Sequence, residues 1–132
     1  MTIRAGKPRT DVAGWVQRAI IAAFFVIAGL DKFSDAPTST WVKIFATIGF
    51  GQWFRIATGV IEIGGGALYL FPKTCKFGAV LLASAMLGAI IAHLTVLRDP
   101  IAIIIRGAIL VAIVLVALRD PNLDLIGTRY GR

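Results

Sequence analysis

The amino-acid sequence predicts an all-α integral membrane protein: a four-helix bundle with four transmembrane helices and a short interfacial helix in the outer loop. Composition is the first reason, because 58% of the 132 residues are hydrophobic and the mean hydropathy is +0.83. Uncharged apolar runs of about 20 residues, the length that crosses a bilayer as a helix, recur along the chain. Charged residues gather at the ends of these runs. We therefore expect residues 1–132 to form a single membrane domain.

The net charge of +7 is distributed in a way that argues against nucleic-acid binding. The basic residues mark the ends of apolar segments and form no stripe with interleaved aromatic residues, as a nucleic-acid groove would require. We interpret them as topology signals and as contacts with anionic membrane lipids. Cys75 is the only cysteine. An intramolecular disulfide, a CxxC pair and a cysteine metal cluster are therefore excluded, and with them the four-helix thiol oxidoreductases of the quinone-coupled kind.

The first predicted span covers residues 12–30. It is apolar apart from Arg18, whose long side chain can reach the lipid head groups from about one turn inside the helix. Asp31 and Lys32 follow directly and mark the opposite interface, where we interpret them as a polar cap.

The outer loop, residues 31–52, contains one short apolar helical face. Large side chains recur at the i, i+3, i+4 and i+7 positions, and Lys43 lies opposite them; the four are Trp41, Ile44, Phe45 and Ile48. This spacing predicts an interfacial helix. The second span then covers residues 53–71, begins at an aromatic anchor, Trp53, and stops at Pro72.

The third and fourth spans are joined by a tight turn. The third covers residues 75–97, and its small residues Ser84 and Gly88 predict a face against which a neighbouring helix packs closely. The fourth covers residues 101–118, and a polar cytoplasmic tail, 119–132, follows it.

Lysine and arginine counts predict the orientation. Nine lie on the side of the termini and of the turn at 72–76, and four lie on the other side. The positive-inside rule then places both termini in the cytoplasm of a multi-pass protein of the cell inner membrane.

Apart from Arg18, the ionisable residues within the spans converge on the outer half of the membrane. At about 1.5 Å per residue, Glu62 lies about 13 Å below Trp53, His93 roughly 6 Å below the outer end of its helix, and Arg106 roughly 8 Å. An ionisable residue in hydrocarbon is costly and indicates a functional or packing site. The sequence therefore predicts a polar pocket with six candidate ligand-binding residues: Glu62, His93, Arg106, Arg55, Asp31 and Lys32.

Helical spacing places Arg55, Gly59, Glu62 and Gly66 on one face of the second span. Gly59 and Gly66 either admit a close helix neighbour or leave room for a ligand. Glu62 and Arg106 either form a structural ion pair or stand apart with a ligand head group or water between them. For His93, a hydrogen-bonded packing role is favoured over a catalytic or metal-binding one, since a lone imidazole lacks companion ligands. We therefore predict no metal site and assign no catalytic residue.

Three short motifs resemble those of the DoxX-like family of small four-span membrane proteins. They are Gly29-x-x-Lys32-Phe33, Gly59-x-x-Glu62-x-x-Gly65-Gly66 and Met86-x-x-Ala89-x-x-x-His93. The resemblance implies a four-helix bundle with a Glu and a His facing a polar pocket. The family includes subunits linked to quinone-dependent sulfur oxidation and partners of detoxifying oxidoreductases, but the fold alone does not license an enzymatic claim.

Three hypotheses for the function follow. The first is an auxiliary or structural subunit of a larger redox or bioenergetic membrane complex, with other integral membrane subunits as partners. The second is a pocket for a quinone or a phospholipid head group, and its enzymatic version is a quinone-linked oxidoreductase subunit. The third is a proton-coupled small-solute transporter, which is less favoured because transporters of that kind place their essential Glu in the first span. Of these roles, one without enzymatic turnover is favoured.

Overall fold

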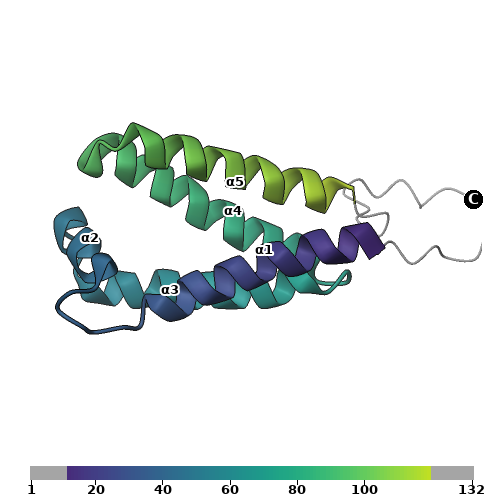
Figure 1. Ribbon diagram of the computed structural model, residues 1–132, viewed down its shortest axis with the longest axis horizontal. Helices are drawn as coiled ribbons and strands as arrows, with labels where there is room; N and C mark the ends of the chain where they lie inside the picture. Colours follow the sequence, from purple (N-terminus) through teal and green to yellow (C-terminus); the bar gives the residue numbers. More distant parts are fainter. Residues whose placement is uncertain (1–11, 120–132) are drawn as a thin grey trace, which may run out of the picture.

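The computed structural model describes residues 12–119, which form helices joined by short connections (Figure 1). In chain order the helices are α1 (Val12–Asp31), α2 (Thr40–Ile48), α3 (Gln52–Leu70), α4 (Cys75–Ala92), the π-helical segment η1 (His93–Leu97) and α5 (Pro100–Leu118). The predicted all-α bundle is confirmed. The spans expected from the sequence correspond to α1, α3, α4 with η1, and α5, whereas all but the first residue of the predicted tail 119–132 lies outside the described residues.

Three described helices are long and apolar enough to cross a membrane: α1, α4 with η1, and α5. Helix α3 reaches that standard only together with α2, from which it is bent by 116°. The reason lies in its composition, because α3 carries Arg55 and Glu62 and three consecutive glycines. These residues are tolerated because α3 lies between α1 and α4, and both charged residues and all its glycines except Gly64 are buried.

The four long helices form two layers, α1 with α3 and α4 with α5. Figure 1 shows the layers meeting at the end where α3 turns into α4 and diverging toward α2, which lies across the other end. Helix α3 also packs on α4, whereas α1 and α5 touch only sparingly. The arrangement is a wedge that is closed at one end and roofed by α2 at the other.

Glycines allow α1 and α3 to approach each other closely. A Cβ built on Gly59 would lie 3.0 Å from the carbonyl oxygen of Gly29, and one built on Gly66 would lie 3.0 Å from that of Ala22. Both distances are too short for a side chain without movement of the neighbour. Backbone contact of this kind is how membrane helices gain packing energy without a hydrophobic driving force.

The closed end of the wedge holds the apolar core. Its fully buried side chains include Phe25, Leu82 and Ile113. Tyr69 is also fully buried, and its hydroxyl donates a hydrogen bond to the carbonyl oxygen of Ile113 at 2.8 Å, which joins α3 to α5. A buried tyrosine hydroxyl needs such a partner, and this one fixes the distance between the layers below the open end.

The turn from α2 into α3 depends on two glycines. Gly49 and Gly51 have φ angles of 89° and 88°, in the left-handed region that glycine adopts without strain. Gln52 then donates a hydrogen bond from its side-chain amide to the carbonyl oxygen of Val42 at 3.1 Å. These residues hold α2 at its sharp angle to α3, over the space between the layers.

Candidate functional site

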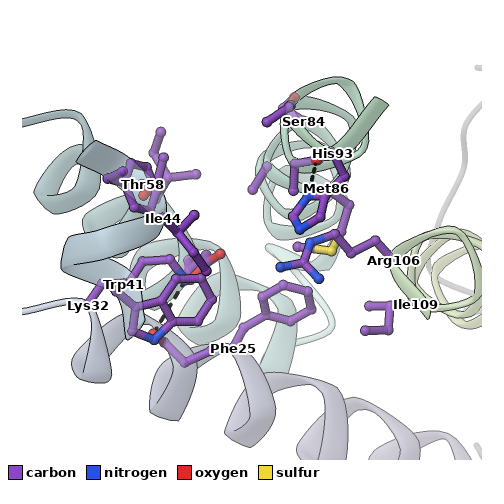
Figure 2. Close-up of a pocket in the computed structure, with 18 of the residues that line it drawn as sticks. Phe25, Lys32, Trp41, Ile44, Thr58, Ser84, Met86, His93, Arg106 and Ile109 are labelled. Atoms are coloured by element: carbon purple, nitrogen blue, oxygen red, sulfur yellow. Dashed lines mark hydrogen bonds and ion pairs between the residues drawn. The ribbon is translucent and has the colours of Figure 1, made fainter. Parts of the chain in front are cut away.

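A pocket of about 410 Å³ lies beneath α2, between the two helix layers (Figure 2). This volume falls within the range of sites for small molecules. The walls are mainly apolar and come from α1 through α5. Four ionisable residues interrupt them: Lys32, Glu62, His93 and Arg106. Four of the six residues predicted to form a pocket therefore line it, whereas Asp31 and Arg55 do not.

Lys32 and Glu62 form a buried ion pair on the α1–α3 side of the pocket. The Lys32 Nζ and the Glu62 Oε2 lie 2.5 Å apart, and the two residues are 3% and 5% exposed. Lys32 follows the last residue of α1, and its side chain turns inward instead of capping the interface as the sequence suggested. The two charges neutralise each other where either one alone would be very costly.

Trp41 of α2 covers this ion pair. Its ring centroid lies 3.8 Å from the Lys32 Nζ, close enough for a cation–π contact. Its Nε1 donates a hydrogen bond to the Asp31 carboxylate at 2.6 Å. Asp31 therefore does not line the pocket but orients the tryptophan that does.

The apolar face of α2 forms the roof of the pocket. All four residues that defined this face in the sequence line the pocket: Trp41, Ile44, Phe45 and Ile48. Lys43, on the opposite face, is exposed. The apolar face that predicted an interfacial helix thus covers the opening between the layers. Such a face is stabilised by any surface that removes it from water.

His93 lies where α4 passes into η1. Its ring is buried, and Nδ1 lies 2.7 Å from the carbonyl oxygen of Ala89. A carbonyl oxygen can only accept, so Nδ1 carries the hydrogen, and Nε2 is not used in this contact. Single π-helical turns of this kind occur often at functional sites.

Arg106 reaches into the pocket from α5. Figure 2 shows its guanidinium between His93 and Phe25, across the pocket from Lys32 and Trp41. Its Nε is buried and has no hydrogen-bond partner, and no residue within 12–119 forms a salt bridge with its guanidinium. Of the two arrangements that the sequence left open for Glu62 and Arg106, the direct ion pair is not formed, because Glu62 pairs with Lys32 instead. An unsatisfied buried donor costs about 1–3 kcal/mol, and more when it is charged.

With this geometry established, comparison with protein families gives a match. The profile of the DoxX-like family matches residues 16–117, which include every residue that lines the pocket. The chain belongs to the DoxX-like family. No curated protein and no solved structure matches it. Family membership and the apolar helices together make it a small multi-pass membrane protein.

Arg55 of this DoxX-like protein has a different place from the one proposed from the sequence. It is buried but does not line the pocket. Its guanidinium donates hydrogen bonds to the carbonyl oxygen of Lys32, to that of Ser34 at 2.8 Å, and to the Asp35 carboxylate at 2.6 Å. Arg55 therefore holds the segment after α1 against α3, and so fixes the backbone of Lys32.

Ser84 and Gly88 of α4, which the sequence predicted to lie on a helix-packing face, line the pocket. Ser84 and Gly88 are exposed on its wall, and nothing lies within 4 Å of a Cβ built on Gly88. The Ser84 hydroxyl donates to the carbonyl oxygen of Val80 at 2.8 Å. Small side chains at these positions leave the pocket its volume.

Sequence reasoning missed the pairing of Lys32 with Glu62 and the role of Trp41 in covering it. The first two family motifs contain a signal for this pairing. Gly29 lies three residues before Lys32, and Gly59 lies three residues before Glu62. The structure places these two glycines in contact. For a metal, the described residues contain no group of three or more His, Cys, Asp or Glu side chains that could hold one.

Proposed function

We propose that this DoxX-like protein binds a lipophilic molecule with a polar head, a quinone or a membrane lipid, in the pocket beneath α2. The observation that carries the proposal is Arg106, a half-buried cation in a mainly apolar pocket, whose Nε is fully buried and has no hydrogen-bond partner. A structural arginine would be expected to have its partner within the protein, since buried charges are normally paired. A polar group from outside the chain would satisfy this one.

The pocket supports the proposal in size and in chemistry. Apolar walls from all five helices suit a ring or an acyl chain, and a few placed polar groups would fix the orientation of the head. Arg106 offers hydrogen-bond donors, and the Nε2 of His93 offers a further polar contact, because only Nδ1 is bonded to the Ala89 carbonyl. We propose binding, and assign no chemical step to the site.

The proposal is tested by identifying the molecules that copurify with the full-length protein. The protein would be extracted in a mild detergent, and bound quinones and lipids would be identified by mass spectrometry. We expect one class to be retained by the wild type and lost from Arg106→Gln. Arg119→Gln is the matched control, because Arg119 follows α5 and is exposed. Equal retention by the wild type and Arg106→Gln would refute the proposal.

A compatible second proposal is that the protein is an auxiliary subunit of a larger membrane complex, redox or bioenergetic. Supporting it, α1 and α5 present large apolar residues outward, such as Ile27 and Ile104, at 67% and 71% exposure. Such faces suit neighbouring membrane proteins as well as lipid. Native electrophoresis after mild extraction tests this, since a protein that always migrates alone has no such partner. The transporter hypothesis gains no support, because Glu62 is already paired with Lys32.

We also propose that the protein lies in the cell inner membrane with both termini in the cytoplasm. The distribution of lysine and arginine along the full sequence supports this orientation. Alkaline phosphatase fused after residue 132 should then be inactive, whereas the enzyme inserted after Pro37 should be active. The opposite pattern would invert the orientation and place α2 on the cytoplasmic side.

A further inference from the structure

We infer that the ligand of the pocket is an anionic amphiphile, whose oxyanion head pairs with Arg106 and whose apolar chain leaves between α1 and α5. This inference rests on the proposed function and narrows its ligand class. It replaces "quinone or lipid" with one head-group chemistry and one path for the tail.

The charges that line the pocket do not balance. Lys32 and Glu62 cancel in their 2.5 Å pair, and an imidazole such as His93 carries no negative charge in any protonation state. Arg106 cannot lose its proton in a protein, so one positive charge remains in an apolar pocket. A ligand that supplies the missing negative charge would be bound more tightly than a neutral molecule of the same shape.

No acid within the described residues is free to serve Arg106. Two acids come into question: Glu62, which lines the same pocket, and Asp99, which directly precedes α5. Glu62 is held by Lys32. The Asp99 carboxylate caps α5, accepting hydrogen bonds from the backbone N–H groups of Ile101 and Ala102 at 3.1 Å each. The counterion must therefore come from outside this part of the chain.

The geometry of the guanidinium also favours an oxyanion. Its donors form a planar fork that matches the two oxygens of a carboxylate or phosphate. A quinone carbonyl presents a single oxygen and leaves the charge uncompensated. His93, which Figure 2 shows beside Arg106, can supply a second polar contact to the same head.

The tail has a path into the bilayer. Phe24 of α1 and Ile105 of α5 both line the pocket, and they are 50% and 52% exposed. The two helices that carry them touch only sparingly, and their ribbons diverge toward α2 (Figure 1). Both helices are apolar enough to span a membrane. The pocket therefore opens sideways toward lipid, which suits a molecule whose chain stays in the bilayer.

The test uses Trp41 as a reporter inside the pocket. In the full-length chain carrying Trp15→Phe and Trp53→Phe, Trp41 is the only tryptophan left. Bromoundecanoate and bromoundecanol have the same brominated chain, which quenches tryptophan fluorescence on contact, and differ only in the charge of the head. Each is titrated into the detergent-solubilised protein at alkaline pH, where the acid is ionised.

We expect saturable quenching by bromoundecanoate at a concentration about tenfold or more below that needed for the alcohol, as one charge-assisted hydrogen-bonded pair provides. Arg106→Gln should abolish this preference, Arg106→Lys should keep most of it, and Arg119→Gln should match the parent. The comparison of acid with alcohol in the parent chain requires no substitution at Arg106, so it stands even if Arg106→Gln does not fold.

Displacement of the brominated probe by unlabelled competitors identifies the class of anion. It also shows whether the inference alone or the proposed function as well is wrong. Displacement of the probe by dodecanoate at lower concentration than by dodecyl phosphate indicates a fatty acid, and the reverse order indicates a phosphate-bearing lipid. If the alcohol binds as tightly as the acid, or if decylubiquinone displaces the probe better than either anion, the inference is overturned while the proposed function stands. If neither brominated probe quenches saturably and decylubiquinone has no saturable effect, both are overturned.

Discussion

The Lys32 ammonium and the Glu62 carboxylate lie 2.5 Å apart although thirty residues separate them in the chain. The pair joins the end of α1 to the middle of α3 and forms one wall of the pocket. Because Glu62 is satisfied in this way, the uncompensated charge in the pocket belongs to Arg106. The pair therefore decides which residue of the pocket is available to a ligand.

Removal of one member of this pair should destabilise the protein strongly. Glu62→Gln or Lys32→Met leaves the other charge buried without a partner, which costs about 3–5 kcal/mol. The double variant Lys32→Met/Glu62→Leu removes both charges and should recover most of that loss. Denaturant unfolding in detergent measures the difference, with Lys43→Met on the exposed face of α2 as control. A double variant no more stable than the single variants would show that the pair is not the cause.

Close packing of α1 against α3 should make Gly66 intolerant of a methyl group. In Gly66→Ala the new Cβ would lie 3.0 Å from the Ala22 carbonyl oxygen and force the helices apart, at a cost of about 1–3 kcal/mol. Gly64→Ala on the same helix is the matched control, because nothing lies within 4 Å of its Cβ. It should be neutral or stabilising by up to about 1 kcal/mol, as alanine favours helix. Equal unfolding midpoints for the two variants would contradict the observed packing.

Truncation of the pocket roof should expose Lys32. Trp41→Ala removes the ring that lies over the Lys32 Nζ, so water and reagents gain access to a lysine that is only 3% exposed. We expect Lys32 to become modified by an amine-reactive reagent in Trp41→Ala and to stay protected in the wild type, as measured by mass spectrometry. Trp53→Ala is the control, because Trp53 is 69% exposed and does not line the pocket. Equal protection in both variants would show that α2 is not the cover.

Loss of the Arg55 side chain should loosen the segment between α1 and α2. Arg55→Gln removes the guanidinium that binds the Lys32 and Ser34 carbonyls and the Asp35 carboxylate. Amide hydrogen exchange in residues 32–39 should become faster, while exchange in the core of α5 stays slow, because local opening follows local contacts. Arg98→Gln, at an exposed arginine, should leave exchange in 32–39 unchanged. Unaltered exchange in Arg55→Gln would mean that the segment is held by other contacts.

The sequence by itself determined the helical class, the long helices and the amphipathic character of α2. The physical reason is strong and local: in lipid a backbone must satisfy its own hydrogen bonds, so an apolar run of sufficient length becomes a helix. Glu62, His93 and Arg106 could be grouped by depth for the same reason, since the rise per residue of a helix is fixed. Depth alone, however, does not say which way each helix is rotated.

Only the tertiary structure decided the partners. In the folded chain Glu62 pairs with Lys32 instead of Arg106, and Arg55 bonds to the segment after α1 instead of lining the pocket. The apolar face of α2 covers the pocket. These choices depend on how far Gly29 and Gly59 let two backbones approach and on the 116° bend between α2 and α3. Ion pairs form over a few ångströms, and helix rotation, crossing and bending arise from packing over the whole chain, so no local pattern in the sequence specifies them.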